Sequence, residues 1–515
     1  MPRLLPLLSV VLITGCTVGP NYQAPQTTAP DAWFEFALAP ATPPDPVGDT
    51  TGPTSRPASV LSRGPVPVAW WTSFKDAKLD DLIVRATRAN LDLRRAAARV
   101  TEARAQRRGT ASDALPALDI GGGYSHVRSG AGAIGGSSAS AGSSGGGTSA
   151  PVAGSSGSTG AEFDIWQAGF DASWEIDVFG RVRRAVEAAD AGLAAAVEDR
   201  RDVMITLLSD VARNYVELRG FQQQARIARE NLDSQRETRK VIQTRFDRGL
   251  APRLDLERTA AQVATTASAI PTFDANARQA AHRLAVLLGL QPQALANELL
   301  KENAIPAPPP SVPVGVPADL LRRRPDVRRA ERQLAAAVAR IGVATADLYP
   351  RFSLAGSLGL QSTDFGSLFN YASRIYSIGP QVSWNIFDAG RIRANIAVGT
   401  AQQEQLLATY EQTVLNALRE VEDALIAYQR ELDRRTTLAA AVNANQRAVA
   451  LANELYTAGR TDFLSVLQAE RDLFQSQDAL VQSDRLVSSN LIALYKALGG
   501  GWELHEQAPQ VARKD

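Results

Sequence analysis

Short segments of the chain alternate between apolar and polar residues. In one of them every second residue from Trp166 to Val178 is apolar, and polar or small residues such as Gln167 and Asp171 stand between them. Such alternation predicts a strand with one apolar and one polar face. The pattern, weakest in the first segment, predicts four strands: residues 117–128, 161–179, 350–361 and 374–388. Because proline has no N–H group to donate, we place Pro380 of the fourth strand at a bulge.

Much longer segments repeat their apolar residues at steps of three, four or seven positions. Leu193, Val197, Met204 and Leu208 follow this spacing, which is typical of helices paired as coiled coils. Six helices are expected on this basis: residues 76–115, 181–247, 253–289, 317–348, 391–457 and 461–499. At about 1.5 Å per residue the helix over 181–247 would be roughly 100 Å long, so it needs partners along its whole length.

The order of these segments occurs twice. The stretch SWEIDVFGR that begins at Ser173 matches SWNIFDAGR at Ser383, an offset of 210 residues, whereas Pro116 matches Pro350 at an offset of 234. The first copy therefore holds 24 extra residues between its two strands. They belong to a tract of Gly, Ser, Ala and Thr at residues 129–160, whose composition predicts a flexible loop.

Cys16 is the only cysteine in the sequence, so it can form no disulfide within the chain. It follows a positive residue, Arg3, and an apolar run at residues 4–13, as the cysteine of a lipoprotein signal would. The order Ile-Thr-Gly-Cys resembles the lipobox of bacterial lipoproteins, in which the signal is cut before the cysteine and the thiol carries a lipid. Thr17, where an inner-membrane lipoprotein usually has Asp, favours the outer membrane. The alternative is an ordinary signal peptide with a chance cysteine.

The repeats and the signal divide the chain into six expected parts. These are a signal peptide at 1–15, a lipid-anchored N-terminal segment at 16–75, repeat 1 at 76–290, a linker at 291–316, repeat 2 at 317–499 and a C-terminal tail at 500–515. Each repeat is expected to run helix, strand, loop, strand, long helix, shorter helix.

Composition narrows the function. The formal net charge of the 515 residues is +1, so we expect no nucleic acid as a partner. The three histidines and the single cysteine form no catalytic, cofactor or metal motif, and we expect none of these sites. No apolar run of about 18 residues follows the signal, so only strands could cross a membrane. About eight strands are the fewest that close a β-barrel, so several copies must contribute, and three would supply twelve.

Longer motifs carry a resemblance to a known family: GCTVGPNYQAP from Gly15, WWTSFKDAKLDDLI from Trp70, the stretch between Arg322 and Leu354, WNIFDAGR from Trp384 and LYKALGGGW from Leu494. In order and spacing they resemble the TolC-type outer-membrane efflux factors, and among these the NodT-like lipoproteins of resistance-nodulation-division (RND) pumps. The resemblance implies a mostly α homotrimer. Its β-barrel, with four strands from each chain, would lie in outer-membrane lipid and continue into the periplasm as a long α-helical barrel of coiled-coil hairpins.

The same resemblance implies partners and a role. A periplasmic adaptor would bind the helical tips, and an inner-membrane RND transporter would supply the energy. The chain itself would have no enzymatic activity and would be a passive exit duct for drugs or other small toxic compounds. The N-terminal segment, the linker at 291–316 and the tail at 500–515 would form an equatorial collar.

Part of a gate also carries over from the resemblance. Close relatives narrow the periplasmic end with a ring of Leu and, one turn later, a ring of Asp. Leu464 matches the Leu, but Gln468 stands at the Asp position, so that ring would be uncharged. Leu464 could instead be a coiled-coil core residue, and we expect the nearby Glu470 to be an ordinary solvated charge. Five residues at the two hairpin tips are candidates for adaptor contact: Arg248, Gly249, Gly459, Arg460 and Thr461.

An alternative keeps the fold and changes the partner. Type I protein secretion would join the same kind of channel to an ATP-driven exporter. The lipobox and the VGPNY start favour the pump-associated branch. The only methionines are Met1 and Met204, which argues against copper or silver as cargo. A simple porin would have no use for the long helices.

Overall fold

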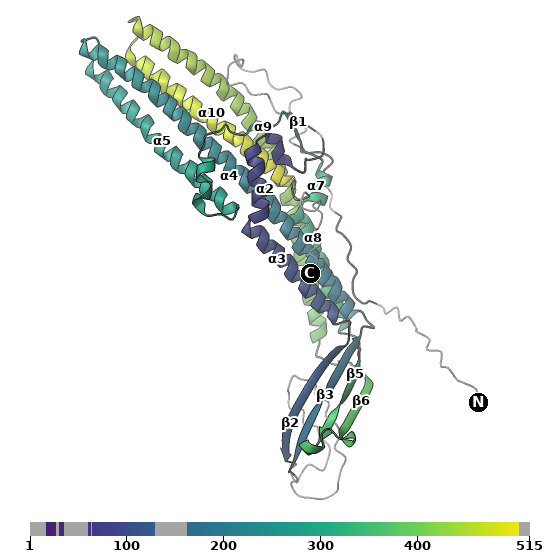
Figure 1. The fold of residues 1–515 in the computed structure, drawn as a ribbon. Helices are drawn as coiled ribbons and strands as arrows, with labels where there is room; N and C mark the ends of the chain where they lie inside the picture. Colours follow the sequence, from purple (N-terminus) through teal and green to yellow (C-terminus); the bar gives the residue numbers. More distant parts are fainter. Residues whose placement is uncertain (1–16, 27–29, 35–59, 63, 129–161, 504–515) are drawn as a thin grey trace. The chain divides into compact units, whose positions relative to one another are not determined.

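Figure 1 shows the fold of the chain, a computed structural model that describes residues 17–26, 30–34, 60–62, 64–128 and 162–503. Cys16, the expected signal peptide and the Gly/Ser loop at 129–160 lie outside the described residues. The chain divides into two compact units. The first combines Met1–Tyr22, Ala105–Asp190 and Ala336–Gln402, and the second combines Gln23–Arg104, Ala191–Ala335 and Gln403–Asp515.

The first unit contains a four-stranded antiparallel sheet. The strands are β2 (Ala117–Arg128), β3 (Glu162–Ile176), β5 (Arg351–Ser362) and β6 (Arg374–Ser383), in the spatial order β2-β3-β5-β6. Two 3-10 turns, η3 (Phe365–Ser367) and η4 (Tyr371–Ser373), connect β5 to β6. Phe170 stands opposite both Ile120 and Leu358, so one face of the sheet is apolar across its width.

The register corrects the expected bulge at Pro380. Pro380 pairs directly with Leu354, and the pairing runs without a break from Arg351–Ser383 to Leu360–Arg374. Strand β6 lies at one edge of the sheet. Within the sheet of a single chain, this edge position accommodates proline in a regular register, because an N–H group on the outer side has no partner in that sheet.

Two tryptophans tie the strands to the preceding helices in the same way. The indole N–H of Trp174 donates to the carbonyl oxygen of Ala114 at 2.9 Å. The indole N–H of Trp384 donates to the carbonyl oxygen of Leu348 at 3.1 Å. Their sequence offsets are 210 and 234 residues, so the repeat read from the sequence is also a repeat of contacts.

The long helices match in pairs. α4 (Arg181–Asp247) and α9 (Arg391–Thr457) each have 67 residues. α5 (Arg253–Leu287) and α10 (Phe463–Ala497) each have 35 residues. No helix in the described part of the chain combines the length and the apolar content needed to cross a membrane.

Two expected helices are each divided. The helix expected over 76–115 is α2 (Ala77–Ala89) followed by α3 (Leu91–Ser112), and that over 317–348 is α7 (Pro317–Arg323) followed by α8 (Pro325–Ala346). Asn90 and Arg324 stand at the breaks with extended backbone. The Asn90 side chain accepts a hydrogen bond from Leu93 N at 2.9 Å and so caps α3. Arg324 precedes a proline, which disfavours helical backbone at that position.

The core of the second unit gathers around aromatic residues. Trp70 of η1 (Trp70–Phe74) stacks on Tyr495 of α10 at 5.3 Å and meets Trp71 edge to face at 5.7 Å. Leu79 and Leu82 of α2 are fully buried beside them. The WWTSF motif is therefore a packing element that fixes the N-terminal part of this unit on the C-terminal helix.

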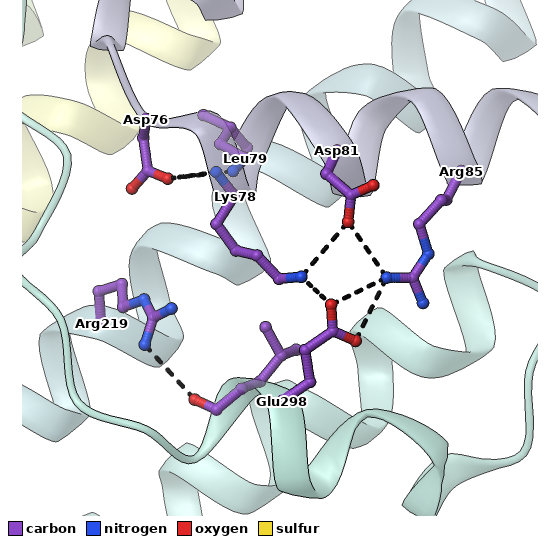
Figure 2. Close-up of polar contacts among 8 residues, drawn as sticks. Asp76, Lys78, Leu79, Asp81, Arg85, Arg219 and Glu298 are labelled. Carbon is purple, nitrogen blue, oxygen red and sulfur yellow. Dashed lines mark hydrogen bonds and ion pairs between the residues drawn. The ribbon is translucent and has the colours of Figure 1, made fainter.

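Ion pairs connect the linker between the repeats to α2. It holds η2 (Pro292–Leu295), α6 (Ala296–Leu299) and β4 (Ser311–Pro313), which pairs in parallel with β1 (Val60–Ser62). Figure 2 shows Glu298 of α6 between Lys78 and Arg85, which both also reach Asp81. Arg85 lies 3.0 Å from Glu298. Arg219 of α4 donates to the backbone carbonyl of Leu299, the last residue of α6.

Candidate functional site at the hairpin tips

The first hairpin tip turns at Gly249, directly after α4. Its N–H donates to Phe246 O at 2.8 Å, and the N–H of Leu250 donates to Arg245 O at 2.7 Å. Gly249 has φ +72°, a left-handed conformation that glycine adopts without the cost of a side chain. Arg248 and Gly249 are exposed. The turn therefore presents an arginine on a fixed backbone.

The second tip repeats this turn after α9. Gly459 has φ +71°, its N–H donates to Tyr456 O at 3.0 Å, and the N–H of Arg460 donates to Leu455 O at 2.8 Å. Asp462 then caps α10, since its carboxylate accepts bonds from the N–H and hydroxyl of Ser465. These bonds hold the pKa of Asp462 below its ordinary value. Arg460 is exposed, and Thr461 is half-buried with its hydroxyl on that of Ser465.

A small apolar cluster joins the helices just inside the tips. Ile242 of α4 packs with Phe463, Val466 and Leu467 of α10. The guanidinium of Arg245 lies 4.6 Å from the ring centre of Tyr456, which meets Phe463 edge to face. Burial raises the pKa of Tyr456. Arg245 and Tyr456 were not among the candidates from the sequence, because their contact joins two helices distant in the chain.

The two gate candidates lie on a different face of α10 from this cluster. Leu464 is 48 % exposed, whereas the adjacent Phe463 is 2 % exposed. Gln468, one turn further, is also exposed, and its amide donates to Asp472 Oδ1 at 2.9 Å. The face therefore carries Leu464, Gln468 and Asp472 in succession. Asp472 was not among the candidates from the sequence, although it follows Gln468 by four residues, as Gln468 follows Leu464.

Glu470 is not the solvated charge that we expected. It is 6 % exposed and accepts a hydrogen bond from the Thr238 hydroxyl at 2.8 Å. Burial, only partly offset by that bond, raises the pKa of Glu470 above its ordinary value. The sequence could have predicted this burial, since Phe463, Leu467 and Glu470 follow the seam spacing of a coiled coil.

Comparison with known proteins decides the family. The family described as outer membrane efflux protein matches residues 82–290 and 316–500, which together make up most of the chain. This chain belongs to the outer membrane efflux protein family. The two matched regions correspond to the two repeats, with their strands and hairpins.

Individual known proteins resemble the chain along nearly its whole length. Nodulation protein T of Rhizobium leguminosarum bv. trifolii is 32% identical over 495 residues, 96% of each chain. Cation efflux system protein CusC of Escherichia coli O6:H1 is 32% identical over 506 residues, 97% of this chain and 99% of the relative. The solved outer-membrane channel OprN is 34% identical with a TM-score of 0.83, covering 95% of this chain and 100% of that one. The predicted resemblance and the mostly helical channel fold are confirmed.

Proposed function

We propose that the chain is the exit duct of a tripartite RND-type efflux pump, which passively conducts small toxic compounds across the periplasm and the outer membrane. The observation that carries the proposal is the match to efflux channels over nearly the whole chain, both hairpins included. The duct has no catalytic role, and the energy comes from the inner-membrane transporter.

The sheet supports assembly of several copies. Apolar side chains on its outermost strands are exposed in the single chain, with Tyr376 at 81 % and Ile378 at 77 %. Both outermost strands, β2 and β6, leave backbone groups free for a further strand. In the proposed homotrimer, the sheets of three copies join edge to edge and enclose one channel.

The same sheet supports a place in the outer membrane. Trp166 and Trp174 lie on one face, eight residues apart, which is about 27 Å along a strand. An apolar band of about 25 Å bordered by aromatic residues is typical of outer-membrane strands. Beyond Trp166 the face becomes polar, with His126 bonded to Asp164 at 2.8 Å. The proposed lipid boundary on this side therefore lies between Trp166 and the bonded pair His126–Asp164.

The exposed face of α10 supports a gate beside the second hairpin tip. In a trimer, three copies of Leu464 would form an apolar constriction. The ring of Gln468 beside it would be uncharged, and Asp472 would place carboxylates one turn further along the channel. The five tip residues that we singled out, with Arg248 and Arg460 exposed, would meet the periplasmic adaptor.

The lipid anchor is part of the proposal. Cleavage after residue 15 would leave Cys16 as the first residue of the mature chain, with a lipid on its thiol. Thr17 would direct the protein to the outer membrane. The chain would thus be held there both by its strands and by acyl chains.

A crosslinked pull-down of the tagged protein from intact envelopes tests the function. Mass spectrometry should identify a periplasmic adaptor and an RND transporter, and the transporter would indicate the substrate class. Recovery of an ATP-driven exporter would instead assign the chain to type I protein secretion and overturn the proposal.

A further inference from the structure

Within the first unit, the segment that follows Cys16 packs where β3 ends and α4 begins. The N–H of Val18 donates to the carbonyl oxygen of Phe179 at 3.2 Å. Gly180 has φ +81°, and a Cβ at that position would lie 2.7 Å from Thr17 Cγ2. Thr17 and Val18 therefore pack directly on the junction where β3 ends and α4 begins, and glycine is needed there both for its backbone and for the space.

A buried arginine holds this segment. The Arg184 side chain, 4 % exposed, donates from Nε to Val18 O at 3.1 Å and from Nη2 to Gly19 O at 3.4 Å. Nη2 also reaches Asn21 Oδ1 at 2.6 Å. Glu187, one turn along α4, balances the charge at 2.7 Å from Nη1. A buried arginine is costly unless its donors are used, and here most of them bind the N-terminal segment.

Gly342 of α8 leaves space for the N-terminal segment on the side away from Gly180. Gly19 has φ +88°, and a Cβ on it would lie 2.5 Å from Gly342 Cα in α8. A Cβ on Gly342 would lie 2.8 Å from Cγ of Arg184. Gly342 therefore forms a notch in α8 in which the segment and the arginine stem both fit.

The internal repeat shows that this arrangement is particular to one place. At the offsets of 210 and 234 residues, Arg184 corresponds to Ala394 and Gly342 corresponds to Arg108. The neighbouring residues do match, since RVRR at Arg181 corresponds to RIRA at Arg391. The copies thus share the glycine at position 180, which corresponds to Gly390, but differ at Arg184 and at Gly342.

We propose that Arg184 positions the mature N-terminus so that the lipid on Cys16 enters the membrane at the β3–α4 junction. The inference rests on the proposed lipidation of Cys16. Successive Cα atoms are about 3.8 Å apart, so a lipid carried by the residue before Thr17 would begin one residue away from the contacts described above. Phe179 stacks on Tyr349 at 4.6 Å at this junction, and tyrosine side chains favour the level of lipid headgroups. The proposed anchor would therefore start from a chain segment that is bonded to the sheet boundary.

Amide hydrogen exchange on the full-length, lipidated protein in nanodiscs tests the seating. Arg184→Met keeps the aliphatic stem and removes the donors, and should speed exchange in residues 17–22 about tenfold or more. Arg393→Met, an exposed arginine at the corresponding turn of α9, is the matched control and should change nothing. If Arg184→Met fails to assemble, Asn21→Ala removes one contact from the segment side and should give a smaller increase. Unchanged exchange in both Arg184→Met and Asn21→Ala would overturn the proposal.

Photo-crosslinking locates the lipid itself. Cells are fed a photoactivatable palmitate analogue, and crosslinked peptides of the protein are identified after illumination. In the wild type, crosslinks should concentrate near Phe179 and Tyr349, and in Arg184→Met they should spread over the apolar face of the sheet. Equal distributions in the two proteins would refute the role of Arg184 while leaving the anchor intact. Absence of any label on the wild-type protein would refute the lipidation on which the inference rests.

Discussion

Arg324 donates a hydrogen bond from Nη1 to the backbone carbonyl oxygen of Ala497 at 2.9 Å, across the break between α7 and α8. Asn90 makes the corresponding bond in the first repeat, from its amide to Leu287 O at 2.8 Å. Each break in a short helix is thus bonded to the last turn of the helix that ends its own repeat. Unsatisfied carbonyls at the end of α5 and α10 are the acceptors.

Replacing Arg324 should cost the most stability. Its guanidinium also binds Asp326 and Glu420, at 2.6 and 2.8 Å. Arg324→Met would leave the carboxylate of Asp326, whose pKa Arg324 keeps low, without its partner. We expect a loss of about 3 kcal/mol, measured by denaturant unfolding in detergent. The exposed Arg322→Met is the control, and equal stability of the two variants would contradict the account.

Asn90→Ala should also lower the stability, but by less than Arg324→Met. It removes two neutral bonds, the cap on Leu93 N and the bond to Leu287 O. The expected loss is about 1–2 kcal/mol, by the same unfolding measurement. If Asn90→Ala lost as much stability as Arg324→Met, the ion pairs of Arg324 would not explain a difference in stability between the two breaks.

Glu470 should make the tip sensitive to pH. Its pKa is raised by burial, so the folded state favours the neutral carboxyl. Stability is therefore full at low pH and falls as pH rises from the unfolded value, 4.5, through the raised folded value. Glu470→Gln keeps an acceptor for Thr238 and removes the charge. Its thermal stability should exceed that of the wild type at pH 7, and the difference should vanish near pH 4. A constant difference across this range would exclude titration of Glu470.

Leu464→Ser should widen the closed channel. The variant removes the apolar side chain of the proposed constriction, so single-channel conductance in planar bilayers should rise. Leu254, the repeat counterpart of Leu464, is also exposed, at 56 %, and Leu254→Ser serves as the control. A rise in both variants, or in neither, would place the gate elsewhere.

Gln468→Asp should alter selectivity. The new carboxylate would stand one turn before Asp472, to which Gln468 now donates. Like charges at this spacing repel and destabilise a helix by a few tenths of a kcal/mol, and three copies would concentrate negative charge in the channel. We expect stronger cation selectivity, read from the reversal potential in a salt gradient. An unchanged reversal potential would show that position 468 does not face the permeating ions.

Cys16→Ser tests the anchor directly. The thiol is the only atom that could carry the thioether-linked lipid, so labelling with radioactive palmitate should be lost. Labelling that persists in the variant would exclude Cys16 as the attachment point.

Much of the fold could be predicted from the sequence because the chain contains an internal repeat. The offset of 210 residues pairs Gly249 with Gly459, and both adopt the left-handed turn that ends a long helix. Alternation placed Trp166 and Trp174 on one face of β3. These features depend on local spacing, which a single sequence contains.

The rest depends on contacts between distant segments. The breaks at Asn90 and Arg324 interrupt a continuous helical pattern, although Pro325 at the first position of α8 was a usable sign. The burial of Glu470 and the contact of Arg245 with Tyr456 arise from neighbouring helices. The role of Arg184 could not be inferred until the segment after Cys16 was seen against it.

The equal lengths of α4 and α9 limit how this protein can change in length. One residue inserted into a helix turns everything beyond it by about 100°, so the seam, the tip and the exposed gate face would all point in new directions. The strands are similarly intolerant, since a shift of one residue exchanges their faces. The 24-residue excess of the first copy lies between β2 and β3. The two copies thus differ in length between a pair of strands, whereas their long helices have kept equal lengths.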